Sequence, residues 1–154
     1  MNFASPLGSV LSSFITELVR DEANASPNYV YILFETTALT LTYLKHSKEA
    51  FATVEAHITP ALNLILQQQQ GSNSEYTSYA FQLYATFVAS ADQLTDNYAL
   101  LANSIMTEQN WQKDLKYLIP ALTNFLVTII AKHPTYAAQQ MKQITTISQH
   151  LLSV

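Results

Sequence analysis

Residues 75–83 read EYTSYAFQL, and they open one helix in a series of paired amphipathic helices. Tyr76, Ala80 and Leu83 recur at the spacing of one helical face. Just upstream, Ser72-Asn73-Ser74-Glu75 has the pattern of a capping box, in which a serine and a glutamate satisfy the free amides at a helix start. The sequence therefore predicts a new helix at this point.

The punctuation of these helices repeats along the chain. An aromatic residue begins the second helix of each pair, at Phe51, Tyr98 and Tyr136. The steps between them are 47 residues (51 to 98) and 38 residues (98 to 136). Paired-helix repeats of the HEAT kind have periods of roughly 40 to 47 residues. The spacing predicts a slice of a helical solenoid, a class of protein that works by presenting a binding surface.

The fold class predicted from these patterns is all-α. No stretch alternates between apolar and polar residues for long enough to indicate a strand, and two glycines could serve few hairpins. We expect a HEAT-repeat α-α superhelix, a right-handed solenoid slice with about seven helices in three antiparallel pairs plus one leading helix. The chain is expected to form a single segment, 1–154. Its parts are a leading helix at about 5–22 and pairs at about 28–70, 73–111 and 114–154.

The composition favours a protein partner over nucleic acid or a membrane. Charged residues make up 12% of the chain, and a net charge of −4 with seven Lys and Arg offers no basic stripe for phosphates. A basic protein partner suits this charge better. The most apolar stretch, Leu118 to Ala131, is shorter than the roughly 20 residues that a membrane span needs. We therefore expect no nucleic-acid partner and no membrane insertion.

No group of residues has the pattern of a catalytic or metal site. The chain has no Cys, which excludes thiolate chemistry. The four histidines, His46, His57, His133 and His150, are far apart, and none pairs with a second ligand on one helix face. Two glycines cannot build a phosphate-binding loop, and no Gly-x-Ser-x-Gly elbow is present. We predict a protein that is not an enzyme and that uses no cofactor and no metal.

The aromatic residues leave two interpretations open, an anchor surface for a partner or packing within and between repeats, with packing favoured. The tyrosines in question are Tyr29, Tyr31, Tyr43, Tyr76, Tyr79, Tyr84 and Tyr98. Trp111 lies in a polar stretch, Glu108 to Asp114, at the junction between two pairs. It suits either an exposed hot spot or a wedge between repeats, and the wedge is the favoured interpretation.

These residues resemble one family over essentially the whole chain: the importin-α re-exporters, or cellular apoptosis susceptibility-type exportins, of the importin-β superfamily. In that family a helix opens with a pattern close to E-F-x-P-Y-x-F-Q. The matching residues here are Glu75, Tyr79, Phe81 and Gln82, with Tyr76 in place of the phenylalanine and Ser78 in place of the proline. Upstream, Phe34-Glu35 stands where the family has a Phe-Glu pair in the preceding first helix.

A second part of the resemblance lies downstream. The family pattern resembles N-x-W followed by G-N-I-P-A-L-x-R-L-L, and here Asn110-Trp111 precedes residues 118–126, LIPALTNFL, which include Pro120. The family glycine is missing, the spacing after Trp111 is longer, and Asn124 stands where arginine is usual. The local turn and any salt bridge from that arginine therefore differ in this chain.

The resemblance implies a non-catalytic part of a nuclear transport receptor that exports importin-α from nucleus to cytoplasm together with the GTP form of Ran (RanGTP). It implies a middle-to-C-terminal HEAT-repeat fragment of a longer receptor that shuttles between nucleus and cytoplasm. In such receptors the second helix of each pair lines the concave, partner-facing side. These helices are expected at Lys48 to Gln69, Thr95 to Asn110 and Thr135 to Val154. The resemblance identifies no individual contact residue.

Two other interpretations stay open. One is a different HEAT-type scaffold or import receptor, which would share the periodicity and lack only the motif matches. The other is a closed helical bundle that binds an apolar ligand among its tyrosines and phenylalanines.

Apolar residues at both ends of the chain predict self-association. A solenoid slice that lacks polar capping repeats leaves apolar area unburied. The residues expected to be exposed are Phe3, Leu7 and Leu11 at one end and Ile147, Leu151 and Leu152 at the other.

Overall fold

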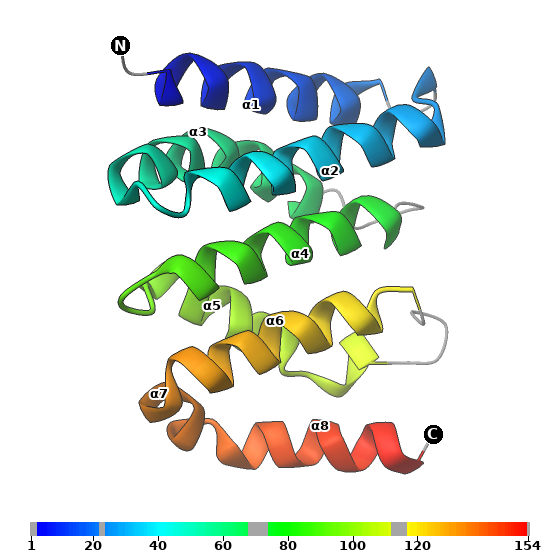
Figure 1. Ribbon diagram of the computed structural model, residues 1–154. Coiled ribbons are helices and arrows are strands. Elements are labelled where there is room, and N and C mark those ends of the chain that lie inside the picture. The colour runs from blue at the N-terminus through cyan, green and yellow to red at the C-terminus, as the bar shows by residue number, and fades with distance from the viewer. Residues whose placement is uncertain (1–2, 22–23, 68–73, 112–116, 154) are drawn as a thin grey trace. The chain divides into compact units, whose positions relative to one another are not determined.

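The computed structural model describes residues 3–21, 24–67, 74–111 and 117–153, and every regular element in these ranges is a helix (Figure 1). The α-helices are α1 (Ala4–Arg20), α2 (Pro27–Leu44), α3 (Lys48–Gln67), α4 (Ser74–Ser90), α5 (Asp96–Ile105), α6 (Ile119–Lys132), α7 (Pro134–Gln139) and α8 (Met141–Ser153). A 3-10 helix, η2 (Glu108–Trp111), follows α5. The all-α fold is confirmed.

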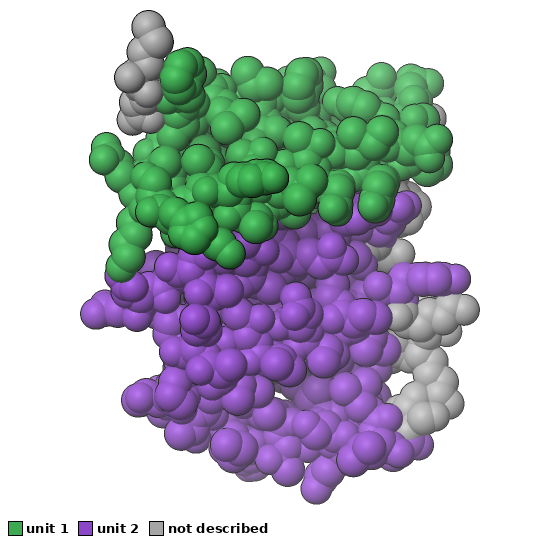
Figure 2. All heavy atoms as spheres, viewed as in Figure 1, with its two compact units in different colours: residues 1–72 green, residues 73–154 purple. Residues whose placement is uncertain are grey.

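The chain divides into two compact units, residues 1–72 and residues 73–154, which Figure 2 shows in two colours. The first unit holds α1 to α3, and the second holds α4 to α8. Each unit has its own buried apolar interior.

In the first unit, α1 packs along α3, and its contacts with its sequence neighbour α2 are far fewer. The buried face of α1 includes Leu11, Ile15 and Leu18, which recur at helical spacing. The two helices approach closely at Gly8, where an added Cβ would lie 2.9 Å from Cβ of His57. Beside this point Ser5 Oγ and His57 Nε2 share a hydrogen bond of 3.1 Å. The N-cap position of α1 is Phe3, whose side chain makes no capping bond. Ser5 lies inside the helix and does not cap it.

Short polar caps fix the ends of α2 and α3. Ser26 Oγ accepts a hydrogen bond from the Tyr29 amide at 3.2 Å, directly before Pro27, the first residue of α2. Ser47 Oγ accepts a hydrogen bond from the Ala50 amide at 3.4 Å and so caps the start of α3. The three residues between α2 and α3 reverse the chain, so the two helices form an antiparallel hairpin (Figure 1).

In the second unit, α4 packs along α6, the helix after next. Phe81 of α4 and Phe125 of α6 have ring centroids 5.6 Å apart, and both side chains are buried. Tyr84, one turn further along α4, contacts the ring of Tyr98 on α5 at 6.1 Å. One side of α4 thus packs on α6 and another on α5.

The same contact pattern occurs in both units and decides the architecture. Each main contact joins a helix to the helix after next, α1 to α3 and α4 to α6. A bundle closed by short loops packs sequence neighbours most extensively, whereas stacked repeats place equivalent helices of successive pairs against each other. The pattern is that of a HEAT-type helical solenoid and argues against the closed ligand-binding bundle.

Two predicted helix boundaries are wrong. The helix predicted over Thr95 to Asn110 ends at Ile105, because the side chains of Asn110 and Trp111 bond back to its last carbonyls. The helix predicted from about 114 begins at Ile119, after a turn at residues 117 and 118, with Pro120 in its first turn, where proline is favoured. Residues 112–116, and residues 72 and 73 of the predicted capping box, lie outside the described ranges.

The last predicted helix is two helices, so the described residues hold eight α-helices where about seven were predicted. The break is at Gln140, whose ψ of 11° departs from the helical value. On one side of the break, Tyr136 of α7 bonds to α5. On the other side, α8 packs against η2. The bend at Gln140 lets both contacts form.

Candidate protein-binding surfaces

The motif residues named from the sequence lie in two environments. Four side chains are buried: Phe34, Tyr76, Phe81 and Trp111. Tyr79 is half-buried. Four are exposed: Glu35, Glu75, Gln82 and Pro120. The buried set packs inside a unit, and the exposed set lies at the surface of α2, α4 and the start of α6.

Trp111 lies in the interior of the second unit. Its side chain is 1% exposed, and its Nε1 donates a hydrogen bond of 2.8 Å to the Ile105 carbonyl oxygen at the end of α5. The neighbouring Asn110 Nδ2 donates to the Ser104 carbonyl oxygen at 3.1 Å. Both bonds satisfy carbonyls that a helix end leaves without a partner. Because its side chain is buried, Trp111 is not available as an exposed hot spot. The 3-10 helix η2, which ends at Trp111, also packs against α8.

The seven tyrosines divide between the two units. Tyr76, Tyr84 and Tyr98 are buried in the second unit, where burial raises the pKa of Tyr84 above its ordinary value and keeps the phenol neutral. In contrast, Tyr29, Tyr31 and Tyr43 of α2 are exposed, Tyr43 by 81%. Together with Ile32 and Leu39 they form an exposed apolar face of α2.

This face leaves one side of α2 exposed, although apolar residues occur on more than one face of the helix. Its positions fall on one side of the helix, opposite the buried Val30, Phe34 and Leu41. An apolar residue composition all round a helix predicts burial, but it does not say which side a neighbour will cover.

Tyr136 joins two helices of the second unit. Its phenol oxygen lies 2.7 Å from Asn103 Oδ1 and 3.2 Å from the Ala99 carbonyl oxygen, both on α5. Partial burial raises the pKa of Tyr136, so the hydroxyl keeps its proton and acts as the donor. This contact holds α7 against α5.

Replacing Tyr136 with phenylalanine is expected to lower the free energy of unfolding by about 1 kcal/mol, because the ring stays in place and one hydrogen bond is lost. Urea unfolding followed by circular dichroism measures the change. The control Tyr43→Phe removes the hydroxyl of an exposed tyrosine and is expected to change stability by less than about 0.5 kcal/mol. Equal effects of the two substitutions would show that the α5–α7 contact does not stabilise the fold.

The two chain ends differ in part from the prediction. Phe3 and Leu7 are exposed as expected, and Leu152 is 88% exposed. Leu11 and Ile147 are buried, so their predicted exposure is wrong. Leu11 lies on the stripe of α1 that packs on α3, and Ile147 is the buried position of α8. The free stripe of α1 instead continues from Leu7 through Val10 and Phe14.

Charge is distributed unevenly along the sequence. All 11 Asp and Glu residues precede position 115, whereas residues 115–154 contain three lysines, Lys116, Lys132 and Lys142, and two histidines. The overall net charge of −4 therefore conceals a basic C-terminal part. Within the described ranges, no cluster of His, Asp and Glu could hold a metal ion. None of the helices described is long and apolar enough to cross a membrane.

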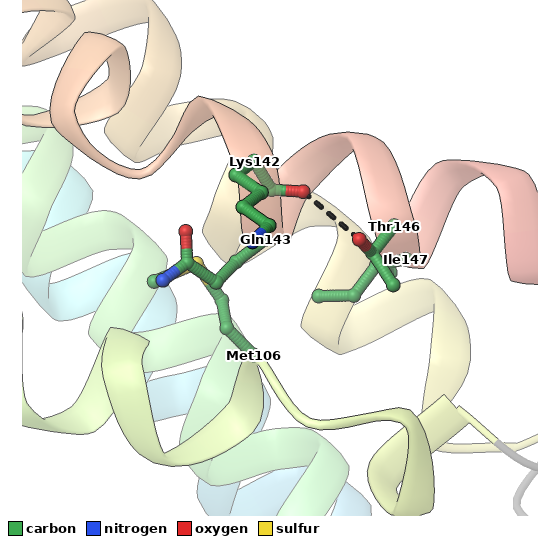
Figure 3. Close-up of a pocket in the computed structure, with 5 residues that line it drawn as sticks. All are labelled: Met106, Lys142, Gln143, Thr146 and Ile147. Atoms are coloured by element: carbon green, nitrogen blue, oxygen red, sulfur yellow. Dashed lines mark hydrogen bonds between the residues drawn. The ribbon is translucent and has the colours of Figure 1, made fainter.

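A groove of about 320 Å³ lies in the second unit between the end of α5 and the first turns of α8. Its lining residues are Met106, Lys142, Gln143, Thr146 and Ile147 (Figure 3). Sequence analysis did not identify this groove. Its one signal in the sequence is the absence of acidic residues after position 114.

In both units the main helix contact joins a helix to the helix after next in the sequence. This stacking defines the class of protein, a HEAT-type helical repeat segment. A comparison with family models matches residues 3–154 to the model described as CAS/CSE protein, C-terminus. The chain belongs to the CAS/CSE family, the importin-α exporters. Searches of the curated proteins and of the solved structures found no match.

Proposed function

We propose that this chain is part of a nuclear transport receptor that exports importin-α from the nucleus in complex with RanGTP. The observation that carries the proposal is the family match over residues 3–154, nearly the whole chain. The HEAT-type stacking supports it, because such repeats act as scaffolds that wrap a partner. The proposed role is non-catalytic and uses no cofactor, and the receptor shuttles between nucleus and cytoplasm.

The repeats of this segment are proposed to be the leading helix α1 followed by the pairs α2–α3, α4–α5 and α6 with α7 and α8. The second helices of these pairs, α3, α5, α7 and α8, are proposed to face the partner. Repeats that contact only their neighbours bend by adding small changes at many interfaces, which lets a superhelix close around a partner. The main contacts with Ran are proposed to lie in another part of the receptor, so this segment alone binds Ran or importin-α weakly or not at all.

The test uses a receptor that contains this segment and measures its affinity for importin-α in the presence of RanGTP. One triple variant replaces exposed polar residues of the second helices, Glu49→Ala, Asn97→Ala and Gln149→Ala. A matched triple variant replaces exposed polar residues of the first helices, Glu35→Ala, Gln82→Ala and Thr123→Ala. The first variant is expected to weaken binding at least about fivefold, because each lost polar contact contributes roughly 0.5–1.5 kcal/mol. Stronger weakening by the second variant would contradict the proposed orientation.

A further inference from the structure

The groove between α5 and α8, lined by Met106, Lys142, Gln143, Thr146 and Ile147, combines an apolar floor with a polar rim (Figure 3). Met106 and Ile147 are buried and form the floor. Lys142, Gln143 and Thr146 are exposed on the first turns of α8. Binding sites for protein segments commonly have this composition, an apolar pocket for one side chain and a few polar groups that fix orientation.

The charge at the rim comes from Lys142. Its side chain is exposed to solvent on the first turn of α8. No acidic residue follows position 114 in the sequence, so α6, α7 and α8 contribute no carboxylate to neutralise it. The Thr146 hydroxyl donates to the Lys142 carbonyl oxygen at 3.0 Å, a bond within α8.

We propose that this groove binds a short acidic protein segment that carries one large apolar side chain. The apolar side chain lies against Met106 and Ile147, and a neighbouring carboxylate pairs with Lys142. Charge complementarity selects this partner, because the groove presents an exposed lysine on the basic C-terminal part of an otherwise acidic chain. The inference rests on the proposed function in one respect only, that α5 and α8 belong to the partner-facing layer.

The test measures binding of a fluorescein-labelled peptide, Asp-Glu-Asp-Leu-Asp-Glu-Asp, to the whole chain by fluorescence anisotropy at physiological salt. Lys142→Glu is expected to weaken binding at least about tenfold, since it replaces an attractive charge pair by a repulsive one. Lys132→Glu makes the same change of net charge on an exposed lysine outside the groove. It is expected to weaken binding less than about twofold, because Lys132 does not line the groove and salt screens charges that do not contact the peptide.

Two further arms test the apolar part of the groove. A peptide with alanine in place of leucine is expected to bind about fivefold more weakly, because it buries less apolar area. Thr146→Trp, which fills the groove and keeps Lys142, is expected to weaken the leucine peptide at least about fivefold, because the large ring excludes the leucine side chain. Circular dichroism of each variant shows whether it is folded. If Thr146→Trp does not fold, the comparison of Lys142→Glu with Lys132→Glu still tests the proposal.

Equal weakening by Lys142→Glu and Lys132→Glu would overturn the proposal, because binding would then follow net charge alone. Equal affinity for the leucine and alanine peptides would overturn it as well. Phosphatidylserine vesicles and a single-stranded oligonucleotide are also tested as competitors of the peptide. If either displaces the peptide and its own binding depends on Lys142, the groove is a general anion site instead of a protein site. None of these outcomes bears on the importin-α affinity of the receptor variants above, so failure of one proposal is distinguishable from failure of the other.

Discussion

Replacing Trp111 with alanine is expected to lower the free energy of unfolding by about 3–5 kcal/mol, the usual range for a fully buried large aromatic side chain. The side chain is 1% exposed, so its removal leaves a cavity beneath η2. It also removes the donor to the Ile105 carbonyl oxygen at the end of α5. An unsatisfied buried acceptor adds to the cost of the cavity.

Urea unfolding of the chain measures this change, and intrinsic fluorescence adds a second observation. The chain has one tryptophan, so its emission reports on the second unit alone. Emission from the folded chain is expected at short wavelength and shifts to long wavelength on unfolding. The control Trp111→Phe keeps most of the apolar volume and loses the indole donor, so it is expected to cost less than the alanine substitution. Long-wavelength emission from the folded chain would contradict the buried position of Trp111.

Replacing Phe81 with alanine is the second substitution with a large expected effect, also about 3–5 kcal/mol. Phe81 is 1% exposed and contributes to the contact between α4 and α6. Its ring centroid is 5.6 Å from that of Phe125 and 6.4 Å from that of Tyr84. Aromatic pairs at such distances add about 0.5–1.5 kcal/mol beyond the buried area.

A double-mutant cycle separates the α4–α6 contact from simple loss of volume. Phe81→Ala, Phe125→Ala and the double variant are compared by urea unfolding, and a coupling of about 0.5–1.5 kcal/mol is expected. The control is Phe14→Ala, because Phe14 lies on the free stripe of α1 and is 49% exposed. It is expected to cost less than about 1 kcal/mol. A cost for Phe14→Ala as large as for Phe81→Ala, or zero coupling between Phe81 and Phe125, would contradict the packing described.

The helices themselves could be predicted from local patterns. Phe51, Ile58 and Leu62 of α3 recur at helical spacing and are all buried. Ser47, a residue type favoured at the N-cap, caps that helix. Local spacing is enough to predict a helix because each helix buries one apolar face. This holds for any neighbour that the face contacts.

Boundaries set by tertiary contacts could not be predicted in the same way. The end of α5 at Ile105 depends on hydrogen bonds from Asn110 and Trp111, which lie beyond the helix in the sequence. The bend at Gln140 depends on the separate contacts of Tyr136 with α5 and of α8 with η2. Neither a propensity nor a period encodes which distant carbonyl a side chain will reach.

The candidate site shows the same limit. The motif residues that mark the family include Phe81 and Trp111, which are interior positions, so they identify the fold better than the place where a partner binds. Met106 and Lys142 are far apart in the sequence and line one groove only because α8 folds back beside the end of α5. Sequence spacing contains no information about such a meeting of two helices.

The affinity of a receptor containing this segment for importin-α, measured with RanGTP, with RanGDP and without Ran, tests the account most directly. In the proposed export cycle the receptor holds importin-α in the nucleus and releases it after GTP hydrolysis, so the two ligands are expected to bind cooperatively. We predict that RanGTP raises the affinity for importin-α at least about tenfold and that RanGDP leaves it unchanged. An affinity that is the same with RanGTP, with RanGDP and without Ran would contradict the proposed function.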